Sequence, residues 1–177
     1  TIGNPAEHSE RLTGTSFTVV EEDGSPRGAR DIAFWRPPVD ETALGEDPGF
    51  EAFREAGTNP VREASSILAH LGLNGVQTLA FTRSRKNAEL GAKYAASAAE
   101  SHPDPGYLDV DPYHAGLGKE TRRGTEHRFK TGQLDGVTST NALELGIDIG
   151  SMDATVLTGY PGTRQSFWQQ VGRSGRG

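Results

Sequence analysis

The chain has 177 residues, enough for one domain with a hydrophobic core, and its 23 glycines and hydrophobic content of 33% suggest long loops around that core. It has no apolar run of about 18 residues and no basic, apolar leader, so we expect a cytoplasmic protein with no membrane partner. The absence of cysteine excludes disulfides and thiolate metal sites, and the five histidines lack the spacing of metal ligands. We therefore expect no structural metal.

The net charge of -6 argues at first against a nucleic-acid partner, because phosphate binding normally requires a basic surface. An acidic domain can nevertheless gather its cations in one groove. Lysine supplies only 4 of the 18 basic residues, and arginine supplies the rest. This acidic, lysine-poor composition is halophile-like, typical of proteins from a salt-rich cytoplasm, although ordinary compositional drift explains it as well.

Residues 1–60 are expected to form a lead-in to the main domain. Residues 15–20 and 30–36 alternate apolar and polar side chains, which predicts two edge strands joined by a turn. Residues 37–60 are rich in proline, glycine and acid and predict a loop. We expect Trp35 to pack against the protein, with stacking on a base as the alternative.

Residues 61–177 alternate regularly between helical and strand patterns. We expect helices over 61–71, 84–101, 119–132 and 165–171, and strands over 76–81, 107–114, 136–140 and 154–159. Strands that alternate with helices predict a single α/β domain, in which a parallel sheet is covered by helices on both faces. Ligands of such sheets bind at the carboxyl ends of the strands, so the loops that follow the strands are the candidate site.

Three of these loops carry hydroxyls, acids or arginines: FTRSR (81–85), STNALELGIDIG (139–150) and QQVGRSGRG (169–177). Hydroxyls and free N–H groups at helix N-termini are natural phosphate sites. Each residue also has a simpler interpretation: Ser84 and Thr140 could be helix caps, Asp148 a turn acid, and Arg83 and Arg85 a solvated face. The ending GRxGR is different, because it places two guanidiniums on a glycine-permitted backbone that can approach a polyphosphate closely.

The order and spacing of these loops resemble the second RecA-like domain of superfamily 2 helicases, the group that contains the DEAD/DEAH-box enzymes. The three loops resemble motifs IV, V and VI, and HAGLGKETRR (114–123) resembles the stretch between motifs IV and V. The wording of motifs V and VI is most similar to the MrfA-like DNA helicases, which are related to RecQ. The resemblance implies a RecA-like fold of the P-loop NTPase type.

The resemblance also implies roles on the nucleotide side of the site. Arg173 and Arg176 would be arginine fingers that act on the γ-phosphate of ATP. Gln169 matches the polar residue that opens motif VI. Gly146 and Asp148 match the positions that contact the ribose.

The resemblance implies a second set of contacts, with the backbone of single-stranded or forked nucleic acid, and it favours DNA over RNA. Thr140 would hold a phosphate of the strand, with Ser84, Arg85, Gly116 and Arg122 as weaker candidates for the same backbone. Such contacts read no bases, so sequence specificity should be low. His114 could belong to this surface, and a satisfied histidine at a strand end is the alternative.

The sequence has no GxxxxGK[ST] phosphate loop and no Asp-Glu pair for Mg²⁺. We therefore expect ATP and Mg²⁺ to be bound mainly by the first RecA-like domain of the same protein, and this chain alone to be inactive. It would then be a piece of a longer helicase, beginning inside motif III and ending just after motif VI. The alternatives are a superfamily 2 translocase that does not unwind, an RNA helicase domain, or a non-catalytic module that binds nucleic acid.

Overall fold

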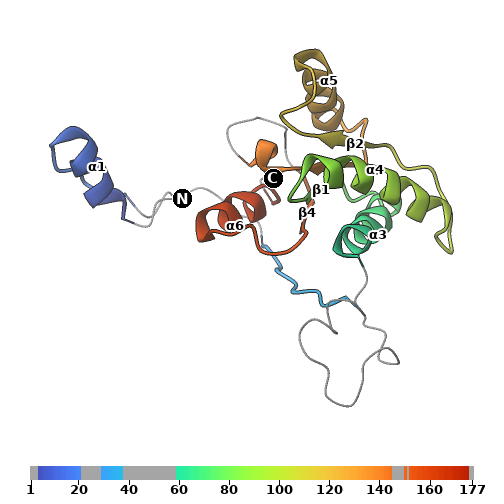
Figure 1. Cartoon of the computed structure of the whole chain (residues 1–177). Coiled ribbons are helices and arrows are strands. Elements are labelled where there is room, and N and C mark those ends of the chain that lie inside the picture. Colours follow the sequence, from blue (N-terminus) through green and yellow to red (C-terminus); the bar gives the residue numbers. More distant parts are fainter. Residues whose placement is uncertain (1–3, 21–28, 38–58, 145–149, 151, 176–177) are drawn as a thin grey trace.

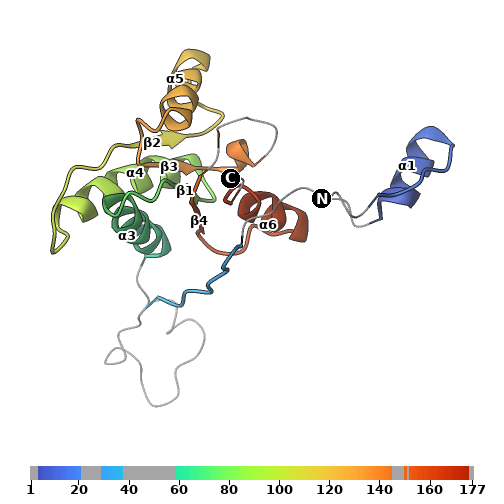
Figure 2. The same cartoon turned by 180° about the vertical axis from the view of Figure 1, so that it is seen from behind.

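The structure, a computed structural model, describes residues 4–20, 29–37, 59–144, 150 and 152–175. Its centre is a four-stranded parallel sheet in the order β2-β3-β1-β4 (Figures 1 and 2). The strands are β1 (Thr78–Phe81), β2 (Val110–Tyr113), β3 (Gly136–Ser139) and β4 (Ala154–Leu157). The helices are α1 (Pro5–Thr13), α3 (Pro60–Leu73), α4 (Arg85–Glu100), α5 (Lys119–Lys130) and α6 (Arg164–Val171), with the 3-10 helix η2 (Asn141–Leu143).

The two central strands, β1 and β3, are buried along their whole length, as expected for a sheet covered on both faces. They pair in parallel from Thr78 opposite Gly136 to Phe81 opposite Ser139. β2 and β4 are only partly buried and lie outside them, which fits their position at the margins of the described sheet. The predicted α/β class with a parallel sheet is confirmed.

Helices α3 and α4 cover one face of the sheet and pack against each other (Figures 1 and 2). Small residues allow this close packing: the hydroxyl of Ser65 on α3 donates a hydrogen bond to the carbonyl of Gly91 on α4 at 3.0 Å. Leu68 and Ala80 belong to the buried cluster between these helices and the sheet. None of the described helices combines the length and apolarity needed to cross a membrane.

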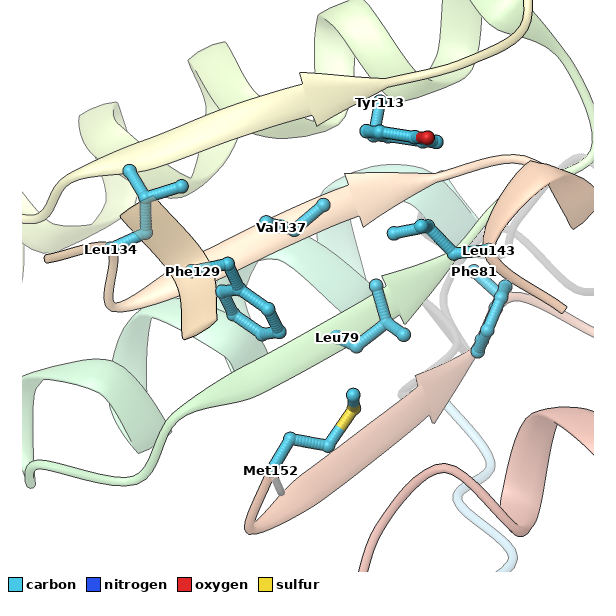
Figure 3. Close-up of a cluster of buried hydrophobic side chains, with 8 residues drawn as sticks. All are labelled: Leu79, Phe81, Tyr113, Phe129, Leu134, Val137, Leu143 and Met152. Atoms are coloured by element: carbon cyan, nitrogen blue, oxygen red, sulfur yellow. The ribbon is translucent and has the colours of Figure 1, made fainter. Parts of the chain in front are cut away.

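The opposite face of the sheet is covered by a second buried cluster, shown in Figure 3. Leu79 and Phe81 of β1 belong to this cluster, whereas Ala80 between them belongs to the first, as the alternation of side chains along a strand requires. Phe129 of α5 and Leu143 of η2 complete the cover from this side. Helical elements therefore lie on both faces, as predicted.

The lead-in differs from its prediction. Residues 15–20 and 30–36 form no strand in the described part of the chain, and their side chains are almost all exposed. Alternating side chains give a strand only where a neighbouring strand takes up its backbone groups, and these two segments pair with none of β1 to β4. The helix α1, which the sequence analysis missed, has no buried residue.

Trp35 also differs from its prediction. Its indole Nε1 donates a hydrogen bond to Glu63 Oε1 of α3 at 2.8 Å, but 64% of the residue is exposed. The polar end of the ring is thus anchored while most of its apolar surface remains in contact with water. Of the predicted loop over 37–60, residues 38–58 lie outside the described residues.

We expect Leu68→Ala to lower the free energy of unfolding by about 2–5 kcal/mol. Leu68 is completely buried, and a Cβ added to Gly136 would lie only 2.9 Å from Leu68 Cδ2, so the site is tightly packed and cannot easily collapse around a smaller side chain. Urea denaturation measures the change. Leu12→Ala is the matched control, because Leu12 is 73% exposed and its truncation should leave the midpoint unchanged; an equal loss in both variants would contradict this packing.

Candidate nucleotide and nucleic-acid site

The loops that follow β1, β2 and β3 leave the same edge of the sheet. The last residues of these strands lie opposite one another, with Ser139 paired to Phe81 on one side and to Tyr113 on the other. Because parallel strands all end at the same edge, this register brings together three loops that are far apart in the sequence.

Ser84 and Thr140 both act as helix caps. Ser84 Oγ accepts a hydrogen bond from the N–H of Asn87 at 3.1 Å, and Thr140 Oγ1 accepts one from Ala142 at 3.4 Å. The interpretation of these two residues as helix caps is therefore confirmed, but a cap can still take part in a further hydrogen bond. A hydroxyl that accepts from the backbone still has its own hydrogen to donate to a phosphate oxygen.

Arg85 and Gly116 come together although 31 residues separate them in the sequence. A Cβ added to Gly116 would lie 3.1 Å from Arg85 Nη1 and 3.1 Å from His114 Nδ1. The missing side chain of Gly116 thus leaves room for the exposed arginine to extend beside the loop that follows β2. The structure brings together these two predicted residues.

His114 is buried and has a partner at each ring nitrogen. Nδ1 accepts a hydrogen bond from the N–H of Gly116 at 3.2 Å, which leaves Nε2 to carry the proton and donate it to Glu89 Oε1 at 2.9 Å. This is the alternative that the sequence left open, a satisfied histidine at a strand end. It fixes the loop that carries Gly116.

Arg122, on α5, lies near the hydroxyl of Tyr113. The pKa of Tyr113 is raised to about 12, first by burial and then by the hydrogen bond that its hydroxyl donates to Glu126, while Arg122 acts in the opposite direction. Arg122 is half-buried, and its Nε finds no partner among the described residues. One donor of this guanidinium is therefore still unused.

The described part of motif VI is built on α6. Thr163 caps the helix by accepting a hydrogen bond from Ser166, and Gln169 lies half-buried near its end. Arg173 follows directly: its N–H donates to the carbonyl of Gln170 at 3.1 Å, and only 8% of the residue is exposed. Its guanidinium is thus held within the domain rather than extended into water. Arg176, Gly146 and Asp148 lie outside the described residues.

A buried hydrogen bond joins the loop after β3 to α6, and the sequence analysis missed it. Gln170 Nε2 donates to Glu144 Oε2 at 3.0 Å, with 6% of Gln170 and 9% of Glu144 exposed. The signal in the sequence is the single acid in ALEL, a stretch that is otherwise apolar. Its partner, 26 residues away, has no local signal.

A second group that the sequence analysis missed is aromatic. The rings of Tyr160 and Phe167 stack with centroids 6.3 Å apart, and Trp168 meets Phe167 edge-on at 5.3 Å. Arg83 Nη2 donates to the carbonyl of Tyr160 at 2.8 Å. Arg83 is therefore more than a solvated side chain, because it ties the loop after β1 to the loop after β4.

In the described part of the chain, no cluster of three or more His, Asp or Glu side chains is arranged to hold a metal ion. The donors that gather at this edge are hydroxyls, backbone N–H groups and guanidiniums. This set of donors suits phosphate oxygens.

A family model described as "Helicase conserved C-terminal domain" matches residues 63–177. The chain belongs to this family. It is 36% identical over 176 residues to the uncharacterized ATP-dependent helicase YprA of Bacillus subtilis, covering 99% of this chain and 22% of YprA. It is 38% identical over 178 residues to the ATP-dependent helicase HRQ1 of Saccharomyces cerevisiae, covering 99% of this chain and 16% of HRQ1. The chain thus spans about a fifth of the length of these helicases.

Solved structures agree with this assignment. The helicase MrfA bound to DNA superposes with a TM-score of 0.82 at 34% identity, over 99% of this chain and 22% of MrfA. MrfA bound to DNA and AMPPNP superposes with a TM-score of 0.80 at 33% identity, over 99% of this chain and 23% of MrfA. A DEAD-box protein from Methanococcus jannaschii superposes with a TM-score of 0.55 at 17% identity, over 67% of this chain and 31% of that protein. This likeness shows only that the two share the RecA-like fold. The resemblance to superfamily 2 helicases, and among them to the MrfA-like group, is confirmed.

Proposed function

We propose that this chain is the second motor domain of an ATP-dependent DNA helicase and acts as part of a longer protein that also contains a first RecA-like domain. The observation that carries the proposal is the match over 99% of the chain to MrfA, whose structure was solved with DNA. The curated relatives are ATP-dependent helicases, and the chain covers only a fifth of them, which leaves room for the domain that binds ATP. A cytoplasmic location is part of the proposal.

On the nucleotide side, Arg173 and Arg176 would neutralise the charge that develops on the γ-phosphate, with Gln169 beside them and Gly146 and Asp148 at the ribose. The backbone of Arg173 is fixed at the end of α6, where its N–H donates to the carbonyl of Gln170 at 3.1 Å, and this sets the point from which its side chain would extend. Guanidiniums cannot hold Mg²⁺, so Mg²⁺ and most of the triphosphate would be bound by the first domain. This chain would contribute the arginines that face the triphosphate from the opposite side.

On the nucleic-acid side, the edge formed by β1, β2 and β3 would follow the backbone of single-stranded or forked DNA. The hydroxyls of Thr140 and Ser84 would donate to phosphates, and Arg85, placed beside Gly116, would supply the charge. Arg122, on the helix α5 that follows β2, would be a further contact. Backbone contacts of this kind hold a strand without reading its sequence.

The mechanism that we propose couples these two sides. ATP between the two domains favours closure and hydrolysis releases it, so that strand contacts on both domains turn the cycle into stepping. Dbp5 of Saccharomyces cerevisiae, which was solved with RNA, shares the fold at 21% identity, whereas MrfA at 34% identity was solved with DNA. This difference favours DNA as the substrate.

In the complete protein, we expect Arg176→Ala to lower DNA-stimulated ATP turnover by about 10³-fold or more, the scale of an arginine finger. Steady-state phosphate release with single-stranded DNA measures it. Arg164→Ala removes an exposed guanidinium from α6 and is the matched control, which should turn over ATP at the normal rate. Unchanged turnover in Arg176→Ala would remove the central assignment.

Arg85→Ala in the complete protein should weaken the binding of single-stranded DNA equally for all sequences and reduce the slope of log affinity against log salt by about one. Fluorescence anisotropy over a range of salt concentrations measures both effects. Lys93→Ala removes one exposed cation from further along the same helix and should change neither. Equal losses in the two variants would show that only the net charge matters and that the Arg85 position has no special role.

A further inference from the structure

Glu144 and Gln170 form a buried hydrogen bond between the two loops to which the proposed function gives different tasks. We propose that this pair is a positioning link, which transmits the presence of a strand at Thr140 to the placement of Arg173. The inference rests on the proposed function and goes beyond it by naming two buried residues to which that function assigns no contact with DNA or ATP.

The first half of the link is one turn of 3-10 helix. Thr140 caps this turn, and Glu144 ends it by donating its N–H to the carbonyl of Asn141 at 3.0 Å. Between them, Leu143 is fixed in the buried cluster of Figure 3. A turn that is hydrogen-bonded at both ends and anchored in the core moves as one body, so a phosphate that draws Thr140 also moves Glu144.

The second half of the link is the end of α6. Gln170 contributes its side chain to Glu144 and its carbonyl to the N–H of Arg173, the latter at 3.1 Å. Val171, between these residues, is buried. The placement of the Gln170 side chain therefore influences the turn from which the guanidinium of Arg173 extends.

The chemistry of the pair favours a directional link over simple packing. A buried carboxylate is costly unless a donor satisfies it, and water is almost excluded from Glu144. Two apolar side chains would fill the same space without that cost, but they could slide past each other. An amide that donates to a carboxylate holds one geometry, and it loses that hydrogen bond when the two groups separate.

A reversed pair tests the link in the complete protein. Gln170→Glu places a second carboxylate against Glu144 and should lower the ratio of DNA-stimulated to DNA-independent ATP turnover about tenfold, within the range known for residues that couple two sites. The double variant Glu144→Gln/Gln170→Glu restores one donor and one acceptor in the opposite direction, and it should recover the ratio to within about threefold. Gln165→Glu makes the same change at an exposed position of α6 and should leave the ratio unchanged.

The ratio distinguishes a positioning role from a merely structural one, because loss of folded protein lowers both rates together. Thermal unfolding of each variant identifies loss of fold. If Gln170→Glu does not fold, the ratio measured for the double variant Glu144→Gln/Gln170→Glu alone decides whether the link exists. A normal ratio in folded Gln170→Glu, or a low ratio in the folded double variant, would overturn the link and leave the proposed function standing. If the complete protein without any substitution shows no DNA-stimulated ATP turnover, both the link and the proposed function are overturned.

Discussion

The burial of β1 and β3 on both faces is the constraint on which the rest of this domain depends. Two fully buried parallel strands must exchange all their backbone hydrogen bonds within the sheet, and this fixes their register from Thr78 opposite Gly136 to Phe81 opposite Ser139. The register in turn decides that the loops carrying Ser84, Thr140 and Gly116 emerge together. A slip of one residue would turn every side chain to the opposite face and would separate Leu79 from its cluster.

Polar contacts then connect the loops to one another at this edge. Arg83 joins the loops after β1 and β4, His114 joins the loop after β2 to α4 through Glu89, and the Glu144–Gln170 hydrogen bond joins the loop after β3 to α6. Each of these contacts links segments that are at least 25 residues apart in the sequence. Side-chain hydrogen bonds therefore tie each loop at this edge to a neighbouring loop or helix.

The strands and helices of residues 61–177 could be predicted because their signals are local. The apolar run 76–81 contains β1, and Ser84 caps the following helix, so the local pattern places both elements. The lead-in was not predictable in the same way, since 15–20 and 30–36 carry a strand pattern but no partner strand. The Glu144–Gln170 pair was missed for a related reason: a tertiary contact between two residues with unremarkable neighbours leaves no periodicity. The expected roles of Arg173 and Thr140 came from the family resemblance and remain predictions, and the structure adds that Arg173 is buried and that Thr140 caps a 3-10 helix.

The central claim is that this domain supplies half of an ATP site and cannot hydrolyse ATP without the other half. Steady-state phosphate release with single-stranded DNA tests it most directly, measured for this domain alone, for the first motor domain alone, and for the intact protein that contains both. The account predicts turnover only in the intact protein. Turnover by this domain alone that disappears on Arg176→Ala would contradict it, because the activity would then belong to these residues without a partner domain.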